Sequence, residues 1–418
     1  MPDVDQRGFD NQPAWLTAAA AAALLDVKRA TLYAYVSRGL LRRLRAPDGS
    51  RRYAREDLLR LRARHDARSG HGPVAAGALR WGEPVLASAI TAIGADGPLY
   101  RGQSAVALAA GGVPFESVAE LLWSDALPST PRRWPAPLPL PLSRLRALLP
   151  REPTAFSVLQ LTTAALRARD PSPYPAAPEA ELERARSLVR ALGGAVALAF
   201  DPGRVAAALA APSLAAALAG ALGGSADRRV VAAVEEALVL SADHELNVSS
   251  FTARIAASAG ADLYACVGAA LATMSGPRHG GECDRFEALV AEAATPRRAR
   301  AVVAARSRRG EPLPGFGHLL YPGGDPRAAR LLEVAHRLAR RASPVRTVDA
   351  IIDAVARTGG EPPALDAGLV ALAAAAALRP GAAAALFALG RTAGWIAHVL
   401  EQRSESVLLR PRARYIGR

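Results

Sequence analysis

The chain has 418 residues, which is long enough for one large domain or for two or three ordinary ones. Half of its residues are hydrophobic and 22% are charged, and this composition excludes a largely disordered chain. Only 5% are aromatic, and alanine and leucine, both helix formers, make up most of the apolar residues. The enrichment in β-branched residues that is typical of sheet proteins is missing. An all-α fold is therefore expected.

The net charge is +14, from 52 basic and 38 acidic residues, and Lys28 is the only lysine. This preference for arginine, together with abundant alanine, is typical of a GC-rich genome, so a single arginine carries little information. Residues 1–70 hold 14 basic and 8 acidic residues, while the other 348 residues hold 38 and 30. The basic density is highest at the N-terminus, and a polyanionic partner is expected there.

Cysteine content and hydropathy both bear on the compartment. The only two cysteines, Cys266 and Cys283, cannot form a disulfide framework, which favours a reducing cytosol. The polar, acidic N-terminus does not resemble a secretory signal. The longest uncharged stretch, residues 205–226, is alanine-rich and interrupted by proline and glycine, which predicts a buried helical hairpin rather than a membrane span. A cytoplasmic protein without a membrane segment is expected.

The N-terminal region shows two helical patterns in succession. Trp15-Leu16-Thr17 opens a pattern that continues over residues 18–25, with Thr17 as the expected N-cap. A second helix is predicted from about Arg29 to Ser37, because Gly39 is a favourable residue just beyond a helix end.

A strand pair and a third helix are predicted next. Residues 40–45 and 51–53 flank a Pro-Asp-Gly turn, which is typical of a two-stranded wing. The third helix is expected to begin near Arg55. A segment rich in glycine, serine and proline predicts a linker over residues 69–80, so that the N-terminal module spans residues 14–68.

This module resembles the winged helix-turn-helix of the MerR type. The resemblance rests on Leu16-Thr17, Leu25-Asp26-Val27, residues 29–35, residues 38–41, residues 49–53 and Asp57-Leu58. It implies that the second helix enters the major groove of DNA and that wing arginines contact phosphates. The expected DNA contacts are Lys28, Arg29, Thr31, Tyr33, Arg51 and Arg52. The alternative is a winged helix that binds protein, or has lost its ligand, with arginines that only reflect the genome.

From residue 80 onward, helical patterns alternate with Pro and Gly breaks, and no series of strands is evident. Three histidines have unusual surroundings: His244 lies in Ala-Asp-His-Glu, His279 in Gly-Pro-Arg-His-Gly-Gly and His318 in Gly-Phe-Gly-His. Neighbouring glycines let the backbone approach a ligand closely, and an imidazole can donate a hydrogen bond or move a proton near neutral pH. Each motif alone is more often a turn between helices than a functional site. The remaining histidines are expected to be ordinary core or surface residues: His336, His398, His65 and His71.

Taken together, these motifs resemble the citrate synthase family over some 330 residues, in the correct order. The landmarks are Leu99-Tyr100-Arg101-Gly102, Leu121-Leu122-Trp123, residues 242–245, residues 251–254, residues 276–281, residues 315–318, Asp325-Pro326-Arg327, residues 365–368, residues 390–398 and residues 410–415. The resemblance implies a two-domain helical body over residues 81–418. The large domain would comprise about 81–274 and 366–418, and the small domain about 275–365.

The resemblance implies condensation of acetyl-CoA or propionyl-CoA with oxaloacetate, giving citrate or 2-methylcitrate and CoA, without a bound cofactor or metal. A carboxylate must remove a methyl proton beside the thioester, while a neutral donor stabilises the enolate oxygen. By resemblance, Asp366 is the base and His279 the donor, and His318 polarises or protonates the oxaloacetate carbonyl. One methylene is worth only ~1–3 kcal/mol in a pocket, so the sequence does not separate acetyl-CoA from propionyl-CoA.

The resemblance also assigns the binding residues. Oxaloacetate needs cationic forks, which would be Arg327 and Arg391, with His244 as a further contact. Arg410 would reach the oxaloacetate site of the neighbouring subunit, which implies a homodimer. The loop near the CoA adenine would consist of Leu313, Pro314, Gly315, Phe316 and Gly317.

The sequence departs from the family pattern beside two of these motifs. The usual Ala-Asn after the His279 motif is Glu282-Cys283, and Leu319-Leu320 follow His318 where a basic or polar residue is usual. His279 and Cys283 are spaced like metal ligands, but no third and fourth ligand follow, so no metal site is expected.

Two other functions stay open from the sequence. One is a DNA-binding transcriptional regulator whose body senses oxaloacetate or acyl-CoA. The other is an inactive relative that stabilises a partner. Retention of His279, His318 and Asp366 favours the enzyme, because a sensor needs only the binding groups and can lose the base.

Overall fold

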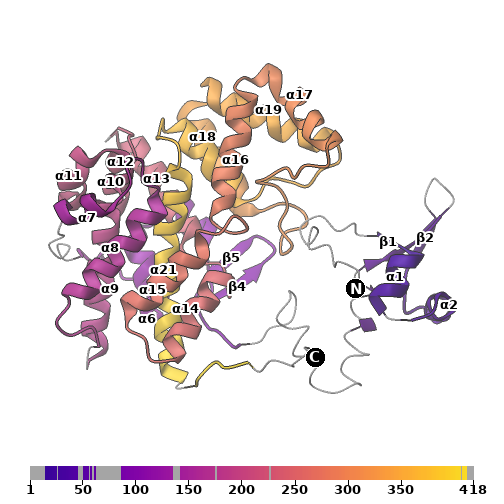
Figure 1. Cartoon of the computed structure of the whole chain (residues 1–418), viewed down its shortest axis with the longest axis horizontal. Coiled ribbons are helices and arrows are strands. Elements are labelled where there is room, and N and C mark those ends of the chain that lie inside the picture. The colour runs from indigo at the N-terminus through magenta and orange to yellow at the C-terminus, as the bar shows by residue number, and fades with distance from the viewer. Residues whose placement is uncertain are drawn as a thin grey trace. The chain divides into compact units, whose positions relative to one another are not determined.

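The computed structural model describes residues 15–25, 27–45, 50–55, 57–58, 61–62, 86–134, 142–174, 177–225, 227–405 and 407–411. The chain divides into two compact units, Met1–Ala87 and Ser88–Arg418 (Figure 1). The predicted linker over residues 69–80, His65, His71, the wing turn at residues 46–49 and the tail from residue 412 lie outside the described residues.

The first unit is a small helix-and-sheet module. Its elements are β1 (Trp15–Thr17), α1 (Ala18–Leu25), α2 (Arg29–Ser37), β2 (Arg43–Arg45) and β3 (Arg51–Ala54). The strands form one antiparallel sheet in the order β1-β3-β2. The module closes over a small core of Ala21, Leu25, Leu32, Leu41, Tyr53 and Leu58.

The predicted first and second helices and the wing strands are confirmed, whereas the third helix, expected to begin near Arg55, lies partly outside the described residues. The hydroxyl of Thr17 accepts a hydrogen bond from the Ala20 N–H at 3.2 Å, as an N-cap does. Gly39, just beyond α2, has a φ of 69°, which glycine adopts without strain. The predicted wing is the β2–β3 pair. Strand β1 was not predicted: three residues give too little alternation to reveal a strand.

The second unit is mostly helical. Its helices are α5 (Ala105–Ala110), α6 (Phe115–Ser124), α7 (Leu142–Leu148), α8 (Ala155–Arg169), α9 (Pro178–Ala195), α10 (Ala197–Phe200), the 3-10 helix η1 (Pro202–Arg204), α11 (Val205–Ala210), α12 (Leu214–Ala221), α13 (Arg228–Ser241), α14 (Val248–Ser258), α15 (Leu263–Met274), α16 (Gly281–Ala293), α17 (Pro296–Arg308), α18 (Pro326–Ala339), α19 (Ser343–Arg357), α20 (Leu365–Ala375) and α21 (Ala382–Glu405). The uncharged stretch after residue 205 forms the hairpin of α11 and α12, as predicted.

The all-α prediction is confirmed for this mostly helical unit, which also holds three short strands that the sequence did not reveal. Strands β4 (Thr91–Gly94), β5 (Gly97–Tyr100) and β6 (Gln103–Ser104) form an antiparallel sheet in that order. Each strand has only two to four residues, and tight turns at Gly97 and Gly102 with positive φ join them. Strands this short give no alternating pattern that could be distinguished from a loop.

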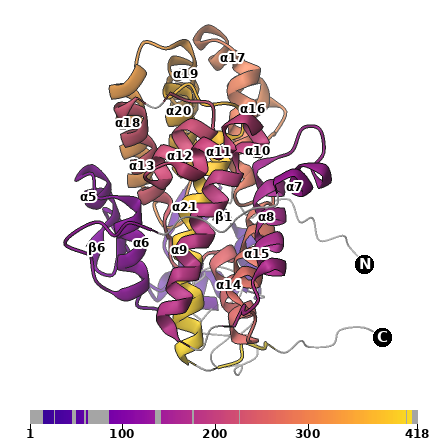
Figure 2. The ribbon, with the colours of Figure 1, turned by 90° about the vertical axis from the view of Figure 1, so that its left-hand side faces the viewer.

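Helix α21 is the central element of the second unit. It packs against α6, α8, α9, α13, α14, α15, α16 and α20, and Figure 2 shows it running through the middle of these helices. Close approach to the end of α13 depends on two glycines: a Cβ at Gly390 would lie 2.8 Å from the Leu238 carbonyl oxygen, and one at Gly394 would lie 2.5 Å from that of Ala242. The Gly394 N–H donates to the Ala242 oxygen at 2.9 Å. The backbone of α21 therefore lies directly against residues 241–243.

Among the described helices, only α21 has the length and hydropathy that a membrane crossing requires, and 94% of its most apolar stretch is buried inside the unit. Such burial is typical of the central helix of a globular domain. Helices α16–α19 gather at one end of the unit, coloured orange in Figure 1, and α20 leads back to α21. The division into a large and a small domain stays a prediction.

Candidate functional site

One part of the candidate site is a group of three aromatic rings, which lie on the segment just after α13 and on the segment just before α18. The ring centroids of His244 and His318 are 5.0 Å apart. The centroid of the Tyr321 ring lies 5.5 Å from that of His244 and 5.2 Å from that of His318. The Tyr321 hydroxyl is 3.0 Å from Nε2 of His244. The Arg327 guanidinium lies over the Tyr321 ring, 5.6 Å from its centroid. Two predicted histidines and one predicted arginine therefore meet around a tyrosine.

Two buried arginines approach this group from different helices. Arg327, in the first turn of α18, donates to both carboxylate oxygens of Asp325 at 3.0 and 2.8 Å. Asp325 also accepts the Leu365 N–H at 3.1 Å, which ties the start of α18 to the start of α20. Arg391, in the middle of α21, donates from Nε to the Ser241 carbonyl oxygen at 2.8 Å. Its guanidinium lies 4.9 Å from the Phe387 ring centroid.

His279 lies in the turn between α15 and α16. Its Nε2 is 2.8 Å from the Ser249 hydroxyl, which also accepts a hydrogen bond from the Trp395 indole at 2.9 Å. The His279 ring meets the Phe387 ring edge-on, with centroids 5.8 Å apart. Helices α14 and α21 thus fix the orientation of the imidazole.

Asp366 lies in the first turn of α20, where the positive end of the helix dipole favours a carboxylate. The thiol of Cys283, in the first turn of α16, donates to Oδ1 of Asp366 at 3.1 Å. Part of the side chain remains accessible, but protein surrounds the carboxyl, and this desolvation raises its pKa to about 6. In the described parts of the chain, no three His, Cys, Asp or Glu side chains are grouped to hold a metal.

All three candidate histidines are neutral at pH 7. Burial lowers the pKa of His279 to about 3, and the charge of Arg391 adds to this. Burial and Arg327 lower the pKa of His318 to about 4, and burial holds the pKa of His244 well below its ordinary value. A neutral imidazole carries one N–H and so donates one hydrogen bond without bringing a charge into the site.

The predicted residues converge on Arg391. Its charge lowers the pKa of His244, His279 and His318, and it interacts electrostatically with Arg327 and Asp366. Five of the other six residues predicted for catalysis or oxaloacetate binding therefore interact electrostatically with one guanidinium.

Arg410, the seventh, lies elsewhere in the same chain. It is exposed on the tail after α21. The neighbouring Leu409 N–H donates to the Ser258 hydroxyl at the C-terminal end of α14, at 3.1 Å. Ser249, which contacts His279, lies at the opposite end of this helix, ~14 Å away at 1.5 Å per residue. The tail therefore holds Arg410 away from the His279 of its own chain.

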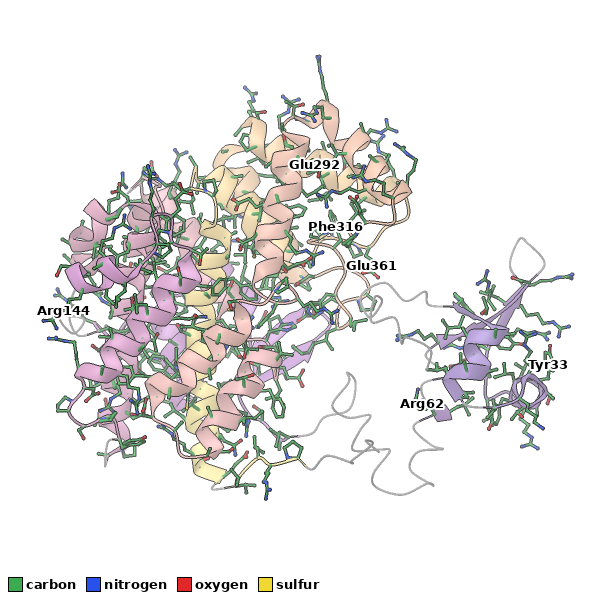
Figure 3. All side chains as sticks on the ribbon, viewed as in Figure 1. Tyr33, Arg62, Arg144, Glu292, Phe316 and Glu361 are labelled. Atoms are coloured by element: carbon green, nitrogen blue, oxygen red, sulfur yellow. The ribbon has the colours of Figure 1, made fainter. Side chains whose placement is uncertain are left out.

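The loop predicted for CoA is fixed between α16 and the segment before α20. The Gly315 N–H donates to Oε1 of Glu282 at 3.0 Å, and the Gly315 carbonyl accepts the Ala364 N–H at 2.9 Å. The Gly317 N–H donates to the Pro362 carbonyl at 2.8 Å. Pro314 and Gly315 are buried, and Leu313, Phe316 and Gly317 are half-buried. Figure 3 labels Phe316 at this place.

The N-terminal unit presents a separate, cationic surface. Lys28 and Arg29 at the start of α2 are exposed, as are Tyr33 and, on the wing, Arg51; Thr31 and Arg52 are half-buried. The Arg51 guanidinium lies 5.2 Å from the Tyr33 ring centroid, so helix and wing meet there; Tyr33 is labelled in Figure 3. The only acidic residue described in this unit is Asp57, which pairs with Arg42 at 2.9 Å. Among the described residues of this unit, the exposed charged side chains are all basic.

Comparison with known families decides the relationship of the second unit. Residues 78–412 match the family described as "Citrate synthase, C-terminal domain". The chain belongs to the citrate synthase family. Residues 15–66 match a family described as "Helix-turn-helix domain".

Individual citrate synthase relatives share parts of the sequence. "Citrate synthase 2" of Bacillus subtilis is 35% identical over 190 residues, 45% of this chain and 51% of the relative. "2-methylcitrate synthase" of Shewanella oneidensis is 34% identical over 188 residues, 44% and 50% of the two chains. The chain thus spans about half the length of the curated relatives it matches.

Solved citrate synthases share the fold over more of the chain. A ternary complex of carboxymethyl coenzyme A and oxaloacetate with the citrate synthase of Thermoplasma acidophilum superposes with a TM-score of 0.70 at 25% identity. The superposition covers 80% of this chain and 94% of the Thermoplasma acidophilum chain. The citrate synthase of Thermotoga maritima has a TM-score of 0.66 at 24% identity, covering 81% and 94%.

Several residues of this family member's site were missed from the sequence. Ser249, Trp395 and Tyr321 contact the predicted histidines, and Asp325 holds Arg327. Ser249 lies beside no signal of its own. Trp395 and Asp325 stand in recognised motifs and Tyr321 follows His318 by three residues, but nothing in those motifs shows that Trp395 meets Ser249 or that Tyr321 meets His244, because these contacts join segments that are distant in sequence.

Proposed function

We propose that the chain catalyses a citrate synthase-type condensation of acetyl-CoA or propionyl-CoA with oxaloacetate, giving citrate or 2-methylcitrate and free CoA. The observation that carries this proposal is the convergence of a carboxylate of raised pKa, Asp366, with two neutral imidazoles, His279 and His318, around Arg391. Family membership supports the same chemistry.

In the proposed reaction, Asp366 removes a proton from the carbon beside the thioester carbonyl. With a pKa of about 6 it is ionised at pH 7 and is a stronger base than an ordinary aspartate. His279 stabilises the developing enolate oxygen. This role requires the ring proton on Nδ1, facing the thioester. The Ser249 hydroxyl must then turn its single proton from Oδ1 of Asn247, 2.7 Å away, to Nε2 of His279.

The enol carbon then forms a bond to the carbonyl carbon of oxaloacetate, while His318 polarises the carbonyl oxygen and supplies a hydrogen bond. Arg327 and Arg391, with His244, bind the two carboxylates of oxaloacetate. Asp325 holds Arg327 in place, while Arg391 is hydrogen-bonded through Nε alone among the described residues, which leaves its other N–H groups for a carboxylate. Hydrolysis of the resulting thioester releases CoA.

We further propose that the active unit is a homodimer, with Arg410 acting in the partner's oxaloacetate site. The tail position of Arg410, away from the His279 of its own chain, supports this arrangement. Cys266 and Cys283 are both free and buried, which fits a reducing cytoplasm as the compartment.

The test is thiol release from acetyl-CoA and from propionyl-CoA in the presence of oxaloacetate, with the purified chain. Asp366→Asn should keep the fold and lower turnover by ~10²–10⁴, the range for loss of a general base. Asp353→Asn, an exposed aspartate on α19, is the matched control and should keep the wild-type rate. No release with either thioester, or wild-type turnover in Asp366→Asn, contradicts the proposal.

A second function, DNA binding by the N-terminal unit, is favoured by its exposed cationic face and by the helix-turn-helix match. Arg29→Ala and Arg51→Ala should weaken binding of the whole chain to duplex DNA and each reduce its salt dependence by about one unit of slope. Arg144→Ala, an exposed arginine of the body labelled in Figure 3, should leave both unchanged. Binding to DNA without any condensation would favour a regulator that senses oxaloacetate or acyl-CoA.

A further inference from the structure

The first turn of α16 contacts two different parts of the site. Cys283 donates its S–H to Oδ1 of Asp366 at 3.1 Å, and the neighbouring Glu282 accepts the Gly315 N–H at 3.0 Å. These are the two positions where the sequence departs from the usual Ala-Asn. An alanine could not accept the Gly315 hydrogen bond, so the link from α16 to this loop depends on the departure itself.

Cys283 is in the form that donates. It is fully buried, and burial together with the charge of Asp366 raises the pKa of its thiol well above the ordinary value. A protonated thiol beside a carboxylate can only donate, and a hydrogen bond to the charged form favours that form. One oxygen of Asp366 is thereby held, and the other is left for a substrate proton.

Glu282 is a fixed negative charge near the same carboxyl. Its Oε1 is held by Gly315, and its Oε2 accepts a hydrogen bond from Arg285 at 2.8 Å. Its charge disfavours a second charge on Asp366 and so raises the pKa of that group, opposite to the effect of Cys283.

Other charged groups act on Asp366 from the helices packed around α20. These are Arg327 of α18, which favours the carboxylate, and Arg391 of α21, which interacts with it electrostatically. Both are assigned to oxaloacetate binding above. Glu282 and Cys283 are therefore the groups near the base that the proposed substrate contacts do not already use.

We propose that Glu282 and Cys283 are positioning residues for the base: Cys283 orients Asp366 and keeps it ionised, while Glu282 opposes that ionisation and fastens the 313–317 loop to α16. This rests on the proposed function, in which Asp366 is the base and the loop lies near acyl-CoA. The departure from the family pattern is thus a way of setting the strength of the base from outside the substrate contacts.

The activity test compares the dependence of kcat/KM on pH. The acid limb of this profile is the range in which kcat/KM falls as the pH is lowered. Cys283→Ala removes the donor and should move the acid limb to higher pH by about 0.5–1 unit. Cys283→Ser keeps a donor, so its acid limb should stay near that of the wild type. Glu282→Gln keeps an oxygen for Gly315 but removes the charge, and should move the limb to lower pH. Glu282→Ala should also raise KM for acyl-CoA, because the loop loses its tie to α16.

The other cysteine provides the matched control. Cys266 is buried and donates weakly to the Ala261 carbonyl, 3.6 Å away, so Cys266→Ala should leave the limb in place. A purely structural role for Glu282 and Cys283 would not move the limb in opposite directions. If the Cys283→Ala and Glu282→Gln limbs coincide with wild type, or move the same way, the proposal is overturned.

A second readout does not depend on activity. In Cys266→Ala protein the S–H stretching band in the infrared arises from Cys283 alone. The band should lie at lower frequency than that of a free thiol, because donation weakens the S–H bond. It should rise in the background of Asp366→Asn and as Asp366 is protonated. If the band lies at the free-thiol frequency and does not move with either change, the proposal is overturned even if condensation is observed. If the band moves with both changes but the protein is inactive, only the proposed function fails.

Discussion

The acid side of the pH–rate profile provides the sharpest test of the site, and Asp366 should set it. Its pKa of about 6 implies that about nine-tenths of the molecules hold an ionised base at pH 7, and about one-tenth at pH 5. The value of kcat/KM should therefore fall about tenfold between these pH values. His279 and His318, with pKa values of about 3 and 4, stay neutral throughout and do not add to the change.

This dependence can be measured with acetyl-CoA and oxaloacetate from about pH 8 to about pH 5, following loss of the thioester absorbance rather than a thiol dye that itself titrates. The ratio kcat/KM is the appropriate quantity, because it reports the free enzyme, whose structure gives the pKa. Circular dichroism at each pH separates titration from unfolding. Equal rates at pH 5 and pH 7 in folded protein would place the pKa of the base near its ordinary value and refute the reasoning from burial.

Four further outcomes follow from individual contacts. Ser249→Ala leaves Nε2 of His279 without its partner, and kcat should fall ~10-fold with little change in KM, as measured by initial rates. Tyr321→Phe removes the hydroxyl that contacts His244 and should raise KM for oxaloacetate several-fold, with the fold unchanged. Gly394→Ala places a methyl 2.5 Å from a carbonyl oxygen and should lower the free energy of unfolding by ~1–3 kcal/mol in a urea titration. Mixing inactive Asp366→Asn protein with inactive Arg410→Ala protein should restore activity at one site in two after subunit exchange; heterodimers that form and stay inactive would place Arg410 in its own subunit's site.

Local signals in the sequence were enough where a structure is decided within a few residues. Thr17 as an N-cap and the end of α2 near Gly39 depend on side-chain and backbone chemistry of the immediate neighbours. Strand β1 is different, because Leu16 pairs with Tyr53, 37 residues later in the chain. No property of Trp15–Thr17 alone distinguishes it from the start of a helix.

The same distinction applies to the candidate site. Glycines beside His279 and His318 mark turns, so these residues could be selected from the sequence. The contacts that set their chemistry join distant segments, as Ser249 does with Trp395 and Cys283 with Asp366. In the sequence, Cys283 is marked by its departure from the family pattern and by its spacing from His279. The role of the thiol depends on the contact between α16 and α20, which brings it to Asp366.

Burial separates the informative arginines from the many that reflect composition. Four of the described arginines have at most 2% of their surface exposed: Arg186, Arg254, Arg327 and Arg391. Arg186 pairs with Glu120, Glu179 and Glu183, and Arg254 with Glu401 and Glu405. These two networks bind helices together and leave little charge for a ligand.

The positive charges of Arg327 and Arg391 have different partners from those of Arg186 and Arg254. Arg327 has one carboxylate partner, Asp325, while Arg391 donates to a backbone carbonyl and, within the described residues, has no carboxylate at salt-bridge distance. The buried carboxylate of Asp243 attracts Arg391 electrostatically without lying at salt-bridge distance from it. Among the described residues only Nε of Arg391 is hydrogen-bonded, so its other N–H groups remain as donors for a ligand. A small dicarboxylate between the two guanidiniums would accept these hydrogen bonds. The unused donors of a buried guanidinium, rather than the number of arginines, are therefore what point to an anionic substrate.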